Sequence, residues 1–569
     1  MLAAGRRTGE RPVWLHALGL AAILLLTLPF TRIGGSLISD EGAAVIQART
    51  LDRDGSWIVH QPLARVDPQD RADPLPYVEA GPKGRAAYAK HPLYPLLLLG
   101  AYRIAGTSGF YLLSVAGTVL AAAGAAALSG VLGARRRLSL WVAGVATPLF
   151  FYAFVIQAHS LGAAAAVGAA LVAWSALRRL TAWRLALLFA LAALATALRS
   201  EAAFFAGGIA LAAVVVGWRS QRRAAIAVAA TAIVAPLVVR LAEREFLVRV
   251  LGSGAGGVGT PGRRGGLTGP VEGFYSTWLS PTNQGTFRLG VFLVIALGLV
   301  AAAALIARRP GRGPVVLACL GGAAVGYLVW FLRAPAVPVE GLAIVFPAGW
   351  AALWAIERSD VRASVSRFSA VALVVFAIAV LLTQYPGGGG PEWGGRFFVV
   401  GLAVATPMAV VVLERVRARA LPEPTASRAV VVLAVVITVV IAWGGVRTLR
   451  QTHANSKDLL AVVEKGGRAA RAPFGPTGDT RPVVVTTVPL LPQLLWEGYD
   501  RLQWLAPNDR DLAMYGERLA AAGADRLVLV SGNATRDVAS LAPWYREVAR
   551  PQQAPGRVPP YPVVVMARR

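Results

Sequence analysis

The sequence predicts an α-helical polytopic membrane protein that ends in a small extracytoplasmic α/β domain. Hydrophobic residues make up 56% of the 569 residues, and charged residues make up only 15%, which is typical of proteins with many membrane helices. Apolar runs of about 16 to 24 residues recur along the chain, close to the length that crosses a bilayer. After residue 446 the composition changes, and shorter apolar runs alternate with polar stretches.

The apolar runs predict about thirteen transmembrane helices. We expect these helices at about 13–31, 109–133, 140–157, 159–177, 183–198, 201–218, 224–241, 286–307, 313–332, 341–356, 368–384, 396–413 and 429–446. No small-residue cleavage site follows the first run, so we interpret it as a retained helix and not as a signal peptide. The predicted domains are therefore a membrane domain over 1–446 and a second domain over 447–569.

Arginine clusters between the apolar runs predict the orientation of the chain. GRRTGER at the start, ARRR at 134–137, WRSQRR and ARRPGR all fall on alternate connections. Cytoplasmic loops carry such clusters, so we expect a cytoplasmic N-terminus and an extracytoplasmic C-terminal domain in the plasma (inner) membrane of a bacterium. The arginine clusters that set this orientation also account for the net charge of +27. The positive charge therefore does not call for a nucleic-acid partner.

The last 120 residues or so read as a soluble domain. RPVVVTT and DRLVLVSG predict buried strands, DLAMYGERLAAAGA predicts a helix that Gly523 ends, and YPVVVMA predicts a closing strand. No glycine-rich loop follows a strand there, so a nucleotide-binding fold is not supported.

The first outer loop, at about 32–108, begins with the adjacent acids Asp40 and Glu41. In one interpretation Ser39 caps a short helix through 51, and the helix dipole stabilises both acids. In the other interpretation the acids carry chemistry. Neighbours on a helix do not share a face, so we expect a single carboxylate base and not two facing carboxylates.

Further polar residues gather at the predicted outer ends of the helices, where ionisable groups are costly unless they are used. Arg199 and Glu201 could form a structural ion pair, His159 could be an interfacial histidine, and Arg396 could be an arginine that snorkels from a helix end. A shared outer cavity explains these residues jointly, with a flexible turn at 386–391 that lets backbone approach a ligand. The residues expected to line it are His91, Tyr94, His159, Arg199, Glu201, Arg333 and Glu392, with Gln157 and Glu340 at the same helix ends.

Three motifs lie in the first hundred residues: Asp40-Glu41-Gly42, Gly55-Ser56-Trp57-Ile58-Val59 and Lys90-His91-Pro92-Leu93-Tyr94. They resemble the first outer loop of the GT-C glycosyltransferases, particularly the protein O-mannosyltransferase and lipid A aminoarabinose transferase branch. That loop has an acidic pair, a Gly-x-Trp-x-Val run and a Lys-Pro-Pro-Leu-Tyr motif. His91 stands here in place of the first proline, and Arg199-Ser200-Glu201 resembles an Arg-x-Glu element of the family.

The resemblance implies a GT-C fold and a bacterial family 39-type enzyme. Such an enzyme takes a sugar from a polyprenyl-phosphate carrier and transfers it to a cell-envelope glycan, lipid or protein outside the membrane. The attacking hydroxyl needs a base, for which we expect Asp40, with Glu41 next. Cations stabilise the leaving phosphate, and we expect Lys90 and Arg396 to bind it. One base predicts inversion at the anomeric carbon.

Two other classes of protein remain as alternatives. A flippase or transporter of lipid-linked sugars predicts repeated halves and broken helices near the membrane midplane, and the sequence shows neither. A resemblance to a glycan polymerase or ligase would rest on a large outer loop late in the sequence instead of an acidic first loop. The sequence predicts no particular cofactor. It leaves a divalent metal ion open, with its ligands unknown.

Overall fold

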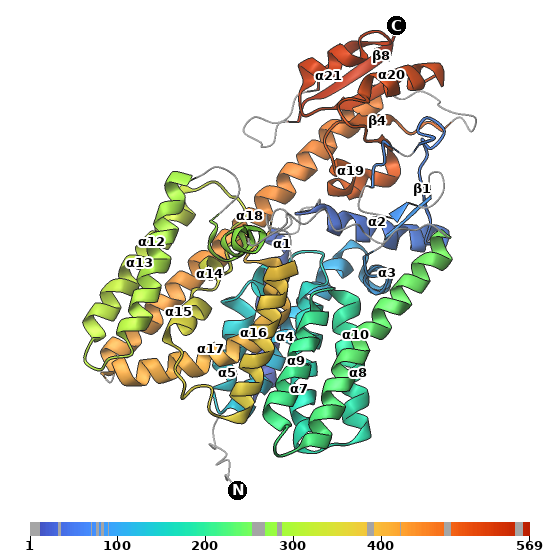
Figure 1. The fold of residues 1–569 in the computed structure, drawn as a ribbon. Coiled ribbons are helices and arrows are strands. Elements are labelled where there is room, and N and C mark those ends of the chain that lie inside the picture. The colour runs from blue at the N-terminus through green and yellow to red at the C-terminus, as the bar shows by residue number, and fades with distance from the viewer. Residues whose placement is uncertain are drawn as a thin grey trace. The chain divides into compact units, whose positions relative to one another are not determined.

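The chain forms two compact units in the computed structural model (Figure 1). The structure describes residues 12–31, 36–69, 71–75, 79–80, 85–88, 90–252, 268–281, 287–383, 392–421, 423–470, 479–551 and 561–569. The first unit, here called the helical unit, comprises Met1–Pro29, Tyr111–Arg240 and Gly262–Thr448. The second, here called the mixed unit, comprises Phe30–Phe110, Leu241–Pro261 and Leu449–Arg569. The first outer loop thus shares a unit with the C-terminal residues.

Long apolar helices build the helical unit, and one end of each of α1, α4, α10 and α18 belongs to the mixed unit. Among the described residues, nine helices are long and apolar enough to cross a membrane. The chain is therefore a multi-pass membrane protein, as predicted. The elements are α1 (Val13–Thr31), α4 (Thr107–Leu132), α5 (Arg136–Val145), α6 (Leu149–Tyr152), α7 (His159–Arg178), α8 (Ala182–Leu198), α9 (Ala202–Gly217), α10 (Arg222–Leu251), α11 (Thr268–Phe274), η1 (Tyr275–Leu279), α12 (Phe287–Ile306), α13 (Gly313–Arg333), α14 (Leu342–Val345), α15 (Pro347–Ala355), α16 (Ser364–Thr383), η2 (Arg396–Phe398), α17 (Val399–Ala420) and α18 (Pro424–Ala469).

Glycines let neighbouring helices of this unit approach closely. A Cβ atom at Gly208 of α9 would lie 2.5 Å from the carbonyl oxygen of Ala372 in α16. A Cβ atom at Gly326 of α13 would lie 2.9 Å from the carbonyl oxygen of Phe292 in α12. Small residues at such crossings are characteristic of packing between membrane helices, where backbone contact replaces the hydrophobic driving force.

Two of the predicted membrane helices are broken, so the expectation of single helices there was wrong. The run at 140–157 divides into α5 and α6 at Pro148, and the run at 341–356 divides into α14 and α15 at Pro347. Proline cannot donate a backbone hydrogen bond and disfavours helical backbone in the residue before it. Two other helices extend beyond their predicted ends. α10 continues to Leu251, and α18 continues to Ala469.

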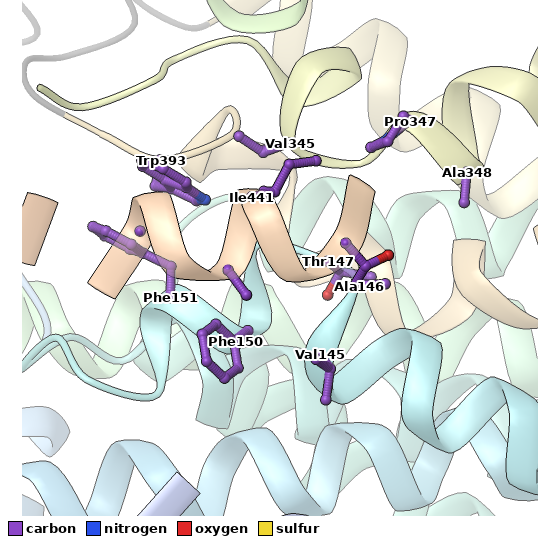
Figure 2. A pocket seen from close by; sticks show the side chains of 13 residues that line it. Val145, Ala146, Thr147, Phe150, Phe151, Val345, Pro347, Ala348, Trp393 and Ile441 are labelled. Carbon is purple, nitrogen blue, oxygen red and sulfur yellow. The ribbon is translucent and has the colours of Figure 1, made fainter. Parts of the chain in front are cut away.

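Residues at both breaks line one small apolar cavity, shown in Figure 2. Thr147 comes from the first break, Val345 and Pro347 come from the second, and the Trp393 ring completes the lining. The cavity volume is about 20 Å³, which is room for about one water molecule. It is far too small for a sugar or a lipid.

The mixed unit contains two sheets (Figure 1). The small antiparallel sheet has the order β1 (Val59–His60), β3 (Arg85–Ala87), β2 (Glu79–Ala80). In the larger sheet, β5 (Gln503–Leu505), β4 (Val483–Thr486) and β6 (Arg526–Val530) are parallel, followed by the antiparallel strands β8 (Val563–Arg568) and β7 (Tyr545–Ala549). The helices are α2 (Ser39–Asp54), α3 (Leu93–Ala105), α19 (Leu491–Leu494), η3 (Trp496–Arg501), α20 (Leu512–Ala521) and α21 (Ala534–Leu541).

The predicted strands and helix of the C-terminal domain are confirmed. The three predicted strands are β4, β6 and β8, and the predicted helix is α20. Gly523 follows that helix with φ +84°, a left-handed backbone conformation that glycine adopts without steric cost. The predicted fold class, a helical polytopic membrane protein with a small C-terminal α/β domain, is thus confirmed.

The first outer loop contributes to the core of the larger sheet. Leu63 and Val66 are buried in one apolar cluster with residues of β4, β6 and α20. Asp67, 3% exposed, fixes this segment, since its carboxylate accepts hydrogen bonds from the Tyr515 hydroxyl at 2.5 Å and from the Ala72 backbone N–H at 2.7 Å. The loop and the C-terminal residues therefore fold as one body.

Helix α2 packs tightly on α19 within the mixed unit, and Gly42 makes this possible. A Cβ atom at Gly42 would lie 1.7 Å from the carbonyl oxygen of Gln493. We expect Gly42→Ala to destabilise the protein by about 1–3 kcal/mol, because the helix must move to relieve the clash. Thermal unfolding of the purified protein in detergent measures this. Gly100→Ala, on α3 with nothing within 4 Å, is the control, and equal unfolding of both variants would contradict the packing.

Candidate functional site

Asp40 and Glu41 both lie in the first turn of α2, but their side chains have different surroundings. Ile38 is the N-cap residue, so the expectation that Ser39 caps this helix was wrong. Glu41 does the capping instead, because its Oε1 accepts hydrogen bonds from the backbone N–H groups of Leu37 at 2.8 Å and Ile38 at 3.1 Å. Glu41 is only 1% exposed, so its carboxylate has a structural role at the start of the helix.

Asp40 lies on a different face and contacts Lys90. The Lys90 Nζ atom donates a hydrogen bond to the Asp40 Oδ1 atom at 2.7 Å, and the two side chains are 30% and 20% exposed. The backbone N–H of Tyr88 donates to Gln47 Oε1 at 2.9 Å, which fixes the segment before Lys90 against α2. Two candidate residues fifty positions apart in sequence are thus neighbours, and both are partly accessible.

His91 and Tyr94 are held beside this pair by the rest of the mixed unit. His91 Nδ1 lies 2.9 Å from Glu243 Oε1, and both side chains are largely buried. Tyr94, in the first turn of α3, is 3% exposed. Glu243 lies in the last turns of α10, and the sequence reasoning did not select it. Its position among charged residues directly after an apolar run was the available signal.

A second group of candidates forms a buried cluster in the helical unit. Arg199 stands between the end of α8 and the start of α9, and its guanidinium makes two hydrogen bonds to the Glu201 carboxylate, at 2.5 and 3.1 Å. A Cβ atom at Gly162 of α7 would lie 2.9 Å from Arg199 Cγ, so this glycine leaves room for the arginine side chain. The predicted ion pair is present, and it is largely buried.

Glu392 interacts electrostatically with Arg199 of that pair and with Arg396 and Glu340. The backbone N–H groups of Gly394 and Gly395 donate to the carbonyl oxygens of Val339 at 2.9 Å and Glu340 at 2.7 Å. Both glycines have positive φ, which few other residues adopt. Arg396 Nε lies 3.5 Å from Glu392 Oε2. The two glycines therefore let the segment that carries Glu392 and Arg396 run directly beside Glu340.

Burial changes the protonation of both carboxyl groups. It raises the pKa of Glu340 to about 7. Burial also raises the pKa of Glu392 well above its usual range. The positive charge of Arg396 lowers this pKa, and the neighbouring Glu340 raises it. Desolvation disfavours the charged form of a carboxyl group. Glu340 therefore keeps its proton below about pH 7 and can act there as a hydrogen-bond donor.

The remaining predicted residues divide between buried and exposed positions. His159 is 1% exposed and its ring stacks on Tyr152 at 4.7 Å. Within the described part of the chain, neither ring nitrogen of His159 nor Gln157 Oε1 has a hydrogen-bond partner. Arg333 is exposed at the end of α13 and is not buried with the cluster. The predicted flexible turn at 386–391 lies outside the described residues.

The described residues contain no group of three or more His, Cys, Asp and Glu side chains that could hold a metal ion. The candidates fall into two sets. Asp40, Glu41, Lys90, His91 and Tyr94 belong to the mixed unit, and the cluster around Arg199, Glu392 and Arg396 belongs to the helical unit.

No family model matches the chain, and no curated protein matches it. Solved structures that are similar include ArnT from Cupriavidus metallidurans, in the apo state (14% identity, TM-score 0.49, 97% of each chain covered). ArnT bound to undecaprenyl phosphate is similar with 13% identity and TM-score 0.48, covering 98% of this chain and 97% of that chain. The Archaeoglobus fulgidus oligosaccharyltransferase in the apo form has 12% identity and TM-score 0.46, covering 97% of this chain and 76% of that one. At this level of identity, no residue role passes from those proteins to this chain.

Proposed function

We propose that this protein is a membrane glycosyltransferase of the GT-C type. It moves a sugar from a polyprenyl-phosphate donor to a cell-envelope acceptor on the extracytoplasmic face. The observation that carries the proposal is the 2.7 Å contact between Asp40 Oδ1 and Lys90 Nζ. The acidic pair and the lysine motif are separate parts of the sequence resemblance, and they supply a carboxylate and a cation at one point of the fold.

The chemistry assigns different tasks to these two residues. Asp40 accepts the proton of the attacking hydroxyl, since a carboxylate within hydrogen-bond reach can serve as a general base. The Lys90 ammonium has three N–H donors, so it can orient Asp40 and also bind the departing phosphate. Glu41 caps α2 through buried hydrogen bonds, which favours Asp40 as the single base and inversion at the anomeric carbon. Arg396 is a second proposed contact for the donor phosphate.

The proposed orientation sets the N-terminus in the cytoplasm and the residues after 447 outside the inner membrane. It follows from the alternating arginine clusters. We expect reporter fusions at Arg137 and Arg450 to report opposite sides of the membrane. Alkaline phosphatase and green fluorescent protein fusions measure this directly, and signals from the same side would contradict the orientation.

Reconstitution tests the donor class. Purified protein in liposomes is offered synthetic polyprenyl-phosphate sugars or nucleotide sugars, together with a cell-envelope extract as acceptor. We expect transfer only from the lipid-linked donors, since nucleotide sugars are made in the cytoplasm and the candidate residues are proposed to lie outside. Transfer from a nucleotide sugar without lipid carrier would show the proposal to be wrong.

A flippase of lipid-linked sugars is the second candidate function. The broken helices α5/α6 and α14/α15 favour it, because transporters commonly break helices near their substrate sites. The same liposomes separate the two functions when the donor is fluorescently labelled. Movement of the lipid-linked sugar between leaflets with no transferred product would support the flippase and exclude the transferase.

A further inference from the structure

The mixed unit contains a second cavity that none of the proposed transfer residues line. Its volume is about 530 Å³, within the range of about 300–1,000 Å³ that is usual for small-molecule sites. One wall comes from the first outer loop, with Arg53 and His60, and the other comes from the C-terminal residues, with Arg481, Tyr499, Asp500 and Trp504. Since both walls belong to the same unit, the cavity is part of one folded body.

Two aromatic residues of the lining, Tyr499 and Trp504, have buried side-chain donors. Tyr499 is 8% exposed and Trp504 is 2% exposed. Among the residues that the structure describes, no group pairs with the Tyr499 hydroxyl or with Trp504 Nε1. Buried polar atoms normally have hydrogen-bond partners, but neither donor atom has surface that water reaches. The rings of Tyr499 and Trp504, and not these donors, therefore contribute to the cavity wall.

The charges around the cavity are already compensated. Arg53 makes two hydrogen bonds of 2.8 Å to the Asp54 carboxylate and one of 2.6 Å to Asp500 Oδ1. Arg481 Nη2 lies 2.6 Å from Asp479 Oδ2, and this contact holds the pKa of Asp479 below its usual range. A phosphate or carboxylate ligand would have to compete with these carboxylates for the arginines. The lining therefore favours a neutral ligand.

We propose that this cavity binds a neutral saccharide. Sugar hydroxyls both donate and accept hydrogen bonds, and the lining offers guanidinium donors at Arg53 and Arg481 and a carboxylate acceptor at Asp500. The apolar faces of sugar rings pack against aromatic, proline and aliphatic side chains. The apolar part of the lining consists of Val59, Pro62, Pro74, Leu502 and the Trp504 ring.

The test is saccharide binding by the full-length protein in detergent on a microarray of neutral and acidic glycans, with inorganic pyrophosphate as competitor. We expect saturable binding to neutral saccharides that pyrophosphate does not displace. Asp500→Asn, which keeps the size of the side chain, should weaken binding about fivefold, and Arg481→Ala at least tenfold. Arg550→Ala removes a surface arginine paired with Glu547 in the same unit, and this control should bind as the unmodified protein does.

Several outcomes would overturn the inference. They are binding to no saccharide, binding to acidic glycans alone, displacement by pyrophosphate, and unchanged affinity in both cavity variants. Thermal unfolding of each variant separates lost binding from lost folding, and Trp504→Phe serves in place of Arg481→Ala if that variant is unstable. The inference does not depend on glycosyl transfer. Asp40→Asn should still bind saccharide, so a failed transfer assay and a failed binding assay remain distinguishable.

Discussion

Asp40→Asn is expected to lower glycosyl transfer by at least about a hundredfold, while expression and donor binding stay near normal. The amide keeps the size of the side chain and a hydrogen-bond acceptor but cannot take a proton from the attacking hydroxyl, and general bases contribute about 10²–10⁴-fold. The measurement is the initial rate of transfer in proteoliposomes with a polyprenyl-phosphate sugar, alongside donor affinity.

The same helix offers a matched control for Asp40. Asp52 of α2 also holds a cation, since Arg103 Nε donates to its Oδ1 at 2.8 Å, and it lies outside the matching motifs. Asp52→Asn should therefore retain transfer. Retained activity in Asp40→Asn would remove Asp40 as the base. Glu41 would then be tested next. Its substitution would also destabilise α2, because its buried capping bonds hold the start of that helix.

Lys90→Ala is expected to weaken donor binding by about tenfold or more, with a smaller effect on acceptor binding. Hydrogen bonds to charged groups contribute about 1.5–3 kcal/mol, and about 1.4 kcal/mol corresponds to a factor of ten in affinity. Titration with a labelled polyprenyl-phosphate sugar measures the change. Arg396→Ala should show the same preference for the donor, because the same phosphate role is proposed for it.

Arg103→Ala is the control for Lys90. It removes an ion pair between α2 and α3 of similar length, 2.8 Å against 2.7 Å, without touching the lysine motif. Its donor affinity should not change. If Lys90→Ala and Arg396→Ala both bind donor normally, the proposed phosphate contacts are refuted, and Lys90 keeps only the task of holding Asp40.

Hydropathy predicted most of the helical unit to within a few residues. α1 occupies 13–31 and α7 occupies 159–178, almost as expected, because long apolar runs must be helical in lipid to satisfy their backbone. Pro148 and Pro347 were the visible signals for the two breaks, and the prediction from apolar length did not use them. Charged residues interrupt the extensions of α10 and α18, so a search for uninterrupted apolar runs could not find them.

The candidate site was predicted as a set of residues and not as an arrangement. The pair Arg199 and Glu201 is two positions apart, so its ion pair could be anticipated from the sequence. The contact of Asp40 with Lys90 spans 50 positions, and that of His91 with Glu243 spans 152. The capping task of Glu41 was hidden because Ser39 was expected to cap the helix, whereas the N-cap residue is Ile38, which has no polar side chain.

By itself, the sequence determined the class of this protein. Membrane helices, arginine alternation and the strands of the C-terminal domain depend on composition and on neighbours within a few residues. Only the tertiary structure decided which polar groups meet. It brought Glu340 beside Glu392 through the backbone of Gly394 and Gly395, and it closed a cavity between segments more than 400 positions apart, from Arg53 to Arg481. Such contacts follow from how whole elements pack, which no local pattern records.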